Sequence, residues 1–287
     1  MIWLVGKNGM LAKETAQIFL ENGLDYCGTD IDVDITDIEQ VKRFIDGKNF
    51  SHIVNCAAYT AVDKAEEDIE KAMSINGYGA ANLAFAATSL NACLIHISTD
   101  YVFDGNTDIP LSEENPVNPL GIYGRTKLLG EYSIELSALK NYFIIRTAWL
   151  YGKHGKNFVN TMLDLMNAKE SIGVVADQWG SPTWTRDLAN FITLIIKSNC
   201  DNYGTYNFSG EGKTNWYEFA KKIYEYGREN GLISKDCTIN ALTTEQYPTK
   251  AKRPKFSYLS KGKATEVFGI TIAKWEESLQ TYLKHMP

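Results

Sequence analysis

The chain contains 287 residues, of which 44% are hydrophobic and 22% are charged, and its formal net charge is −6. This composition is typical of a soluble globular protein with one large or two modest domains, and the negative charge argues against a general affinity for nucleic acid or anionic lipid. No apolar run approaches the ~20 residues of a membrane span, the first residues lack the basic region of a signal peptide, and five cysteines without a C-x-x-C pair fit a reducing cytoplasm.

Short apolar segments alternate with helix-period segments through the first half of the chain. We predict strands at 2–5, 25–30, 52–58, 93–99 and 142–152, and helices at 11–23, 37–47, 72–90 and 124–137. The strand segments are apolar throughout rather than alternating, which indicates strands covered on both faces. The pattern therefore predicts an α/β fold with a Rossmann-like, doubly wound parallel sheet.

The second half of the chain has a looser pattern. A long loop is predicted at 103–121, and loops of that length are usually functional or disordered. Further helices are expected at 156–168, 184–198 and 214–230, with strand-like pieces at 172–178 and 205–210. We assign residues 1–152 to a dinucleotide-binding core, and residues 153–287 mainly to a smaller α/β substrate-binding lobe from which some segments return to the core.

A glycine-spaced turn follows the first predicted strand. Gly6 permits a tight turn, Gly9 lets a phosphate approach the backbone, and the small Ala12 allows close helix–strand packing. The next helix then offers free N–H groups and the positive end of its dipole to a pyrophosphate. We expect the following residues of this turn to bind the cofactor: Gly6, Asn8, Gly9, Met10 and Leu11.

The second predicted strand ends at an acidic residue, Asp30, about 20 residues beyond the glycine turn. A carboxylate at this position accepts hydrogen bonds from both hydroxyls of the adenosine ribose and repels a 2′-phosphate, which favours NADH over NADPH. Asp32, Asp34 and Asp37 lie nearby, so the sequence leaves open which of them face the ribose and which are solvated or cap the next helix.

The segment GIYGRTK (121–127) places Tyr123 and Lys127 four residues apart, on one face of a predicted helix. Alone, this spacing indicates an ordinary amphipathic helix more often than a site, because Tyr-x-x-x-Lys arises often by accident. However, the strand at 93–99 ends in Ser98 and Thr99, and doubly wound sheets gather their ligands at such strand ends. The combination with the glycine turn is typical of the extended short-chain dehydrogenase/reductases.

Six further segments resemble the dTDP-4-dehydrorhamnose reductase family of that superfamily. They are NCAAYTAVDKAE (55–66), STDYVFDG (98–105), RTAWLYG (146–152), GKNFVNTML (155–163), DQWGSPTWTRDLA (177–189) and RPKFSYL (253–259). The resemblance covers most of the chain. It implies that further residues line the cofactor: Ala57, Ala58 and Tyr59 after the third strand, and Asp34 and Ile35 beside the adenine.

The resemblance also implies a catalytic role for three residues. Tyr123 is expected to donate a proton to the C4 carbonyl of a 4-keto-6-deoxy sugar, and Thr99 to hydrogen-bond that carbonyl, with Ser98 as the open alternative. The pKa of a free phenol is about 10, and we expect Lys127 to lower it by favouring the phenolate. The resemblance also places Tyr123 and Lys127 among the cofactor-binding residues, and in the family this lysine binds the nicotinamide ribose.

On the substrate side, we expect contributions from Asp100, Trp149 and Arg253. Trp149 and Asp100 are assigned to the sugar, and the Arg253 guanidinium to a diphosphate. Some members of the family hold a metal between two subunits through acidic residues. Glu14 lies at one such position, but Arg186 stands where a second carboxylate is expected, so we predict no metal and leave a homodimer open.

The predicted function is therefore the reduction of an NDP-4-keto-6-deoxy sugar, of the kind that serves dTDP-rhamnose and polysaccharide biosynthesis. Dehydration is not expected, because Asp100 is followed by Tyr101 rather than by the second acid of the related 4,6-dehydratases. Two alternatives remain: an epimerase that retains its NAD, and a non-catalytic regulatory subunit on the same fold.

Overall fold

The computed structural model describes residues 1–198 and 200–286, and its largest element is a parallel sheet. Within these residues the sheet has six strands: β1 (Ile2–Val5), β2 (Tyr26–Thr29), β3 (His52–Asn55), β4 (Cys93–Thr99), β5 (Tyr142–Thr147) and β10 (Gly204–Asn207). They lie in the order β2-β1-β3-β4-β5-β10. The chain leaves β1 for β2 on one side and then crosses to β3 on the other, so a crevice opens at the carboxyl ends of β1 and β3.

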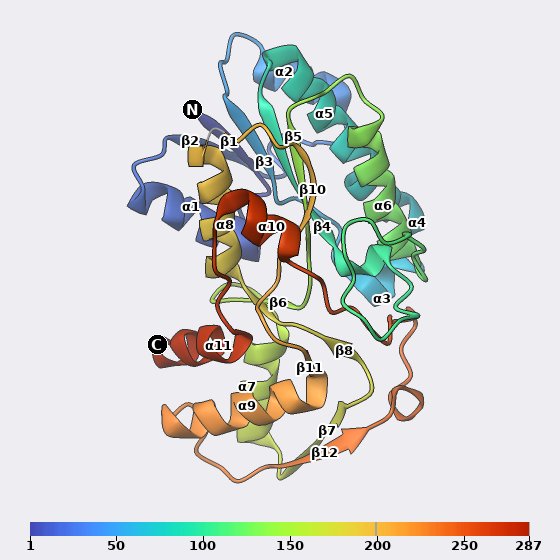
Figure 1. Ribbon diagram of the computed structural model, residues 1–287, viewed down its shortest axis with the longest axis vertical. Helices are drawn as coiled ribbons and strands as arrows, with labels where there is room; N and C mark the ends of the chain where they lie inside the picture. Colours follow the sequence, from blue (N-terminus) through green and yellow to red (C-terminus); the bar gives the residue numbers. More distant parts are fainter. Residues whose placement is uncertain (199, 287) are drawn as a thin grey trace.

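Helices cover both faces of this sheet (Figure 1). One layer contains α1 (Met10–Glu21), α8 (Thr185–Ser198) and α10 (Gly262–Phe268), and the other contains α2 (Ile38–Ile45), α5 (Gly79–Leu90) and α6 (Ile122–Glu135). Alternate residues of β1 face opposite layers: Ile2 and Leu4 pack toward α1 and α8, whereas Trp3 and Val5 pack toward α2 and α5. The predicted doubly wound fold is confirmed. No helix among residues 1–198 and 200–286 is long and apolar enough to cross a membrane.

The predicted helix at 72–90 is interrupted. It consists of α4 (Ile69–Met73), a π-helical turn η1 (Ser74–Tyr78) and α5. The wide turn points the buried Asn76 side chain inward, where it accepts a hydrogen bond from the Tyr59 N–H at 2.8 Å and donates to the Thr126 hydroxyl at 3.0 Å. This polar link fastens the segment after β3 to α6, which explains a π-turn that apolar periodicity could not predict.

Two predicted strands are shorter than expected. The third ends at Asn55, and residues 56–61 continue as an irregular segment beside the glycine turn. The fifth breaks after Thr147, because Trp149 has a φ of 48°, and only β6 (Leu150–Tyr151) follows the break. A bulky residue in this backbone region is uncommon and is often found where a side chain must be aimed at a site.

A second apolar core lies below the sheet in Figure 1. It is formed by α7 (Phe158–Ala168), α9 (Trp216–Glu229), α11 (Trp275–Lys284) and the parallel pair β7 (Ser171–Val175) and β12 (Thr238–Leu242). The short strands β8 (Trp179–Gly180), β9 (Thr183–Trp184) and β11 (Thr214–Asn215) complete it, and the remaining short elements are α3 (Val62–Ala65), η2 (Asp100–Val102) and η3 (Thr244–Gln246). The sequence patterns missed β12, α10 and α11.

Segments from the second half also complete the large sheet. β10 pairs with β5, and α8 packs against α1 on the outer face. The long loop at 103–121 is irregular as predicted, apart from a single bridge between Leu111 and Leu259. This bridge attaches the loop to the C-terminal RPKFSYL segment and thereby brings Arg253 near the end of β4.

Candidate active site

The glycine turn after β1 leaves space that a side chain would fill. Gly6 has a φ of +78°, and a Cβ atom there would lie 2.8 Å from the Ala57 backbone nitrogen. Gly9 caps α1 with extended backbone, and neither a side-chain cap nor an acidic residue occupies the first turn of that helix. The N–H groups at the start of α1 are therefore available to an anion, as a pyrophosphate site requires.

A cavity of about 630 Å³ lies at this turn, at the carboxyl ends of β1, β2 and β3. Eight of the predicted cofactor residues line it: Gly6, Asn8, Gly9, Asp30, Asp34, Ile35, Ala57 and Ala58. Three do not. Leu11 is buried in the core beneath α1, Met10 receives a contact from Asn157, and the Tyr59 hydroxyl donates to Asp68 at 2.8 Å. The sequence patterns missed Lys71, Ser74 and Ile75, which the turn from α4 into η1 brings to the cavity wall.

Asp30 connects the end of β2 to the glycine turn. Its Oδ2 accepts the Asn8 N–H at 2.9 Å, and its Oδ1 accepts the Ile31 N–H at 3.0 Å. Asp32 instead pairs with Lys7 at 3.4 Å in an exposed position, and Asp37 caps α2. Of the four clustered aspartates, Asp30 and Asp34 line the cavity.

The three expected catalytic residues meet where β4 ends and α6 begins. Thr99 is the last residue of β4, and Tyr123 and Lys127 lie on successive turns of α6. The Thr99 hydroxyl donates a hydrogen bond to Asp100 Oδ1 at 3.0 Å and accepts one from the Tyr101 N–H at 3.2 Å. It also lies within hydrogen-bonding reach of Tyr123. The Ser98 hydroxyl points to the other side of the strand and donates a hydrogen bond to the Glu131 carboxylate. Arg146 forms an ion pair with the same carboxylate at 2.7 Å.

Burial dominates the electrostatics of this cluster. Burial raises the pKa of Tyr123 to about 12, and only its hydrogen bond with Thr99 lowers it in part. Lys127 forms no hydrogen bond to Tyr123: its Nζ donates to the Ile97 carbonyl at 2.6 Å and lies 3.1 Å from His96 Nε2. Burial also lowers the pKa of Lys127 to about 8. The net effect of these surroundings is to raise the pKa of Tyr123, and the lowering expected from Lys127 stays a prediction.

Asp100 and Tyr101 extend the cluster beyond the predicted residues. Burial raises the pKa of Asp100 to about 6, and this carboxyl group accepts the Thr99 hydroxyl rather than lining either of the two large cavities. The Tyr101 ring packs edge-on against Tyr123 with ring centroids 5.4 Å apart, and its hydroxyl lies 3.2 Å from Arg253 Nη1. Tyr101 was missed as a site residue, although it directly follows the strand-end motif.

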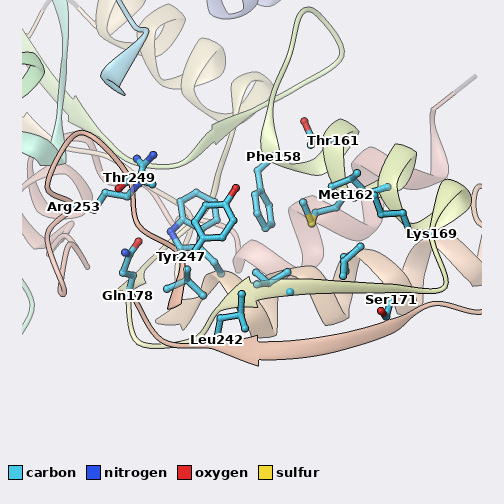
Figure 2. A pocket seen from close by; sticks show the side chains of 16 residues that line it. Phe158, Thr161, Met162, Lys169, Ser171, Gln178, Leu242, Tyr247, Thr249 and Arg253 are labelled. Carbon is cyan, nitrogen blue, oxygen red and sulfur yellow. The ribbon is translucent and has the colours of Figure 1, made fainter. Parts of the chain in front are cut away.

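A second cavity, of about 670 Å³, lies between α7 and the β7–β12 pair. Figure 2 shows Arg253, Thr249, Gln178 and Tyr247 at one end of it, Lys169 and Ser171 at the other, and the apolar Phe158 and Met162 between them. Arg253 is held by Asp63, whose Oδ2 accepts from Nη2 at 2.9 Å. Trp149 does not line the cavity itself. It stacks on Trp216, which does, with ring centroids 3.7 Å apart.

The acidic position that the resemblance associates with a metal is paired within the chain. Glu14 is buried on α1 and forms an ion pair with Arg186 of α8 at 3.1 Å, and Glu21 pairs with the same guanidinium at 2.7 Å. Across residues 1–198 and 200–286, no group of three or more His, Cys, Asp or Glu side chains is arranged to hold a metal ion. The two helices are thus joined by ion pairs through Arg186.

The doubly wound sheet, the glycine-turn cavity and the Thr–Tyr–Lys cluster define a class, the nucleotide-binding short-chain dehydrogenase/reductases. Comparisons with known proteins are more specific. The family model described as "RmlD substrate binding domain" matches residues 1–287. The chain is 37% identical over 287 residues to the dTDP-4-dehydrorhamnose reductase of Aggregatibacter actinomycetemcomitans, covering 96% of each sequence.

Two solved structures are similar along almost the whole chain. A dTDP-4-dehydrorhamnose reductase from Clostridium acetobutylicum is 41% identical with a TM-score of 0.92, covering 98% of both chains. One from Bacillus anthracis, solved in complex with NADP, is 37% identical with a TM-score of 0.93, covering 99% of both chains. This chain belongs to the dTDP-4-dehydrorhamnose reductase family. The family predicted from the sequence is confirmed, and with it the enzyme class, an NAD(P)H-dependent sugar reductase.

Proposed function

We propose that this chain reduces a dTDP-4-keto-6-deoxy sugar of the dTDP-4-dehydrorhamnose type at C4, with NADH as the preferred reductant and Tyr123 as the proton donor. The observation that carries the proposal is the position of the Thr99–Tyr123–Lys127 cluster relative to both cavities. Cys56 lines the first cavity and lies near Lys127. Tyr101 joins Tyr123 to Arg253, which lines the second.

The first cavity fits a dinucleotide. Gly6 and Gly9 leave the backbone bare where a pyrophosphate must approach, and α1 presents unpaired N–H groups to it. The Asp30 carboxylate faces the same cavity at the distance along the chain expected for a ribose partner. When bound, the reduced nicotinamide supplies a hydride. We assign Gly6, Asn8, Gly9, Asp30 and the Ala57–Ala58 segment to holding this cofactor.

Tyr123 acts as the general acid in this scheme. Burial raises its pKa to about 12, so the phenol holds its proton at neutral pH until charge develops on the C4 oxygen of the substrate. The proton then moves from the Tyr123 hydroxyl to that oxygen, and the carbonyl becomes a secondary alcohol. The phenolate left behind is stabilised by Lys127 in its protonated form, and Tyr123 regains a proton before the next cycle.

Thr99 orients the carbonyl, and Asp100 orients Thr99. The Asp100 carboxylate accepts the Thr99 hydroxyl at 3.0 Å and so fixes the rotamer of that side chain in the absence of substrate. Asp100 is therefore better assigned to positioning than to direct contact with the sugar. Trp149 contributes through its stacking on Trp216, at the wall of the second cavity.

Arg253 is the proposed partner of the substrate diphosphate. It lines the second cavity, and its guanidinium is fixed by Asp63 at 2.9 Å and by the Tyr101 hydroxyl at 3.2 Å. A guanidinium held in this way loses little side-chain entropy when it binds an anion. The apolar side chains Phe158, Met162 and Trp216 of the same cavity suit the flat face of a nucleobase.

A spectrophotometric assay at about 340 nm, the NADH absorbance band, tests the proposal. We expect the protein to oxidise one NADH for each dTDP-4-dehydrorhamnose added, and to oxidise NADH faster than NADPH. Conversion of a nucleotide sugar without net loss of NADH contradicts the reductase and favours an epimerase. Binding of NADH without turnover on any 4-keto nucleotide sugar favours a regulatory subunit.

A further inference from the structure

A chain of three buried polar side chains lies behind the catalytic cluster. Asn55 ends β3, His96 lies in the middle of β4, and Lys127 projects from α6, and each of these residues is 1% exposed. Neither Asn55 nor His96 lines either large cavity or has a role in the proposed mechanism. Buried polar groups of this kind are costly unless their hydrogen bonds are satisfied, so the direction of each bond carries information.

The backbone fixes the orientation of the Asn55 amide. The Ala57 N–H can only donate, and it points at Asn55 Oδ1 at 3.0 Å. The amide oxygen therefore faces Ala57, and the NH₂ group faces His96 Nδ1 at 2.9 Å. Because an amide NH₂ has no acceptor capacity, His96 Nδ1 must accept, and it carries no proton.

This assignment determines the tautomer of His96. Burial and the neighbouring Lys127 hold the pKa of His96 well below its usual value, so the ring is neutral. Its single proton lies on Nε2, which is 3.1 Å from Lys127 Nζ. An ammonium group has no lone pair to accept this proton, whereas an uncharged amine has one and can still donate to the Ile97 carbonyl at 2.6 Å.

We infer that His96, oriented by Asn55, is a positioning residue that favours the uncharged amine of Lys127 and thereby sets the alkaline limit of the reduction. The inference rests on the proposed function, because it assumes that protonated Lys127 stabilises the Tyr123 phenolate. Without that charge the phenolate is disfavoured, so the rate of reduction falls as Lys127 loses its proton.

The other groups that face Lys127 do not cancel this effect. Glu131, one turn further along α6, favours the charged lysine, but Arg146 from β5 and the Ser98 hydroxyl already engage that carboxylate. Cys56, after β3, is held neutral by burial, which raises its pKa to about 12. Tyr123 on the same helix is also neutral at physiological pH. Burial is the largest cause that brings the Lys127 pKa to about 8. The inferred Nε2–H donor of His96, 3.1 Å away, acts in the same direction.

The first test measures the tautomer directly and needs no activity. Two-bond ¹H–¹⁵N correlation spectra of the protein labelled at histidine distinguish Nε2–H, Nδ1–H and imidazolium forms, and the His96 signals are assigned by their loss in His96→Gln. We expect a neutral Nε2–H ring throughout the range of about pH 6–9, since a buried histidine resists protonation. An Nδ1–H ring or an imidazolium in this range overturns the inference.

The second test measures kcat/KM for NADH-dependent reduction as a function of pH. In His96→Gln the amide oxygen can turn toward Lys127 and accept from its ammonium, so we expect the alkaline limb to move up by about one pH unit. In Asn55→Asp the carboxylate cannot donate to Nδ1, the ring proton moves there, and Nε2 becomes an acceptor. We expect a larger upward shift, because the added negative charge also favours the ammonium.

His52→Gln is the matched control. His52 begins β3, three residues before Asn55, and contacts Ser51 rather than the Asn55–His96–Lys127 chain, so we expect the profile of the unaltered protein. An alkaline limb that stays in place in both His96→Gln and Asn55→Asp, with or without a uniform loss of rate, overturns the inference. If the unaltered protein reduces no 4-keto nucleotide sugar, the proposed function fails, and the tautomer measurement alone decides the state of His96.

Discussion

The 630 Å³ cavity at the glycine turn and the 670 Å³ cavity beside Arg253 are similar in size, but they are formed by different means. Residues between Val5 and Ile75 line the first, largely with backbone and small side chains that follow three strands. Residues from α7, β7, α9, β12 and the C-terminal segment line the second, mostly with large side chains. A site made by backbone geometry is local in sequence, whereas a site made by convergent side chains depends on the tertiary fold.

Tyr123→Phe sharpens the comparison most, because Tyr123 belongs to the cluster that we propose to act on ligands of both cavities and packs on Tyr101, which contacts Arg253 of the second. We expect kcat to fall by roughly 10²–10⁴, the usual contribution of a general acid, while NADH affinity stays within about twofold. Tyr132→Phe is the matched control: Tyr132 is an exposed residue of the same helix, and we expect this variant to have an unchanged kcat. Steady-state kinetics and NADH titration measure both effects, and near-normal turnover of Tyr123→Phe removes Tyr123 from the mechanism.

Gly6→Ala tests the cavity made by backbone. A Cβ there lies 2.8 Å from the Ala57 nitrogen at a φ of +78°, so the turn must distort. We expect NADH affinity to fall by roughly 10–100-fold, since each 1.4 kcal/mol of distortion costs a factor of ten. Gly47→Ala is the control: its φ of +66° is similar, but nothing lies within 4 Å of the added methyl group. Equal NADH affinities in the two variants, measured by fluorescence titration, contradict the assignment of the turn.

Arg253→Ala tests the cavity made by side chains. Loss of a charge-assisted contact to the diphosphate is expected to raise KM for the nucleotide sugar by about tenfold or more, with NADH affinity unaffected. Lys250→Ala is the control, because Lys250 lies three residues away and forms an exposed ion pair with Glu67. If KM rises to the same extent in both variants, the effect is one of general surface charge rather than of Arg253.

Asp30→Ala gives the smallest expected effect. The carboxylate lines the first cavity and is held by the Asn8 N–H, so its loss removes the repulsion of a 2′-phosphate. We expect the ratio of kcat/KM for NADH to that for NADPH to fall by about fivefold, roughly 1 kcal/mol. Asp25→Ala, at the amino end of the same strand, is expected to leave the ratio as it is. An unchanged ratio in Asp30→Ala assigns the discrimination to another residue.

Much of the sheet and of the first cavity follows from the sequence alone. The short apolar segments locate β1, β2 and β4 to within a residue or two. A strand covered on both faces is apolar along its length, so it can be recognised without knowing which strand it pairs with. The Gly6–Gly9 spacing likewise predicts the tight turn and the bare backbone at the start of α1. The break at Trp149 and the π-turn at Asn76 could not be predicted, since each depends on tertiary contacts with residues far away in the chain.

The electrostatics of the catalytic cluster were the least predictable part. The Tyr-x-x-x-Lys spacing correctly placed Tyr123 and Lys127 on one helix face, but the state of Lys127 depends on His96 and on burial, which the spacing does not contain. Tyr101 could have been noticed, because it follows Asp100 directly at the strand end. Its contact with Arg253 could not, since that contact requires the C-terminal segment to pack beside β4.

Isotope transfer tests the central claim most directly. The protein is incubated with dTDP-4-dehydrorhamnose and NADH dideuterated at C4 of the nicotinamide, and the product is examined by mass spectrometry and NMR. The account predicts one deuterium per product molecule, located at C4 of the sugar, with Tyr123→Phe forming the same product far more slowly. A product with hydrogen at C4, or an epimerised sugar formed without consumption of NADH, contradicts it.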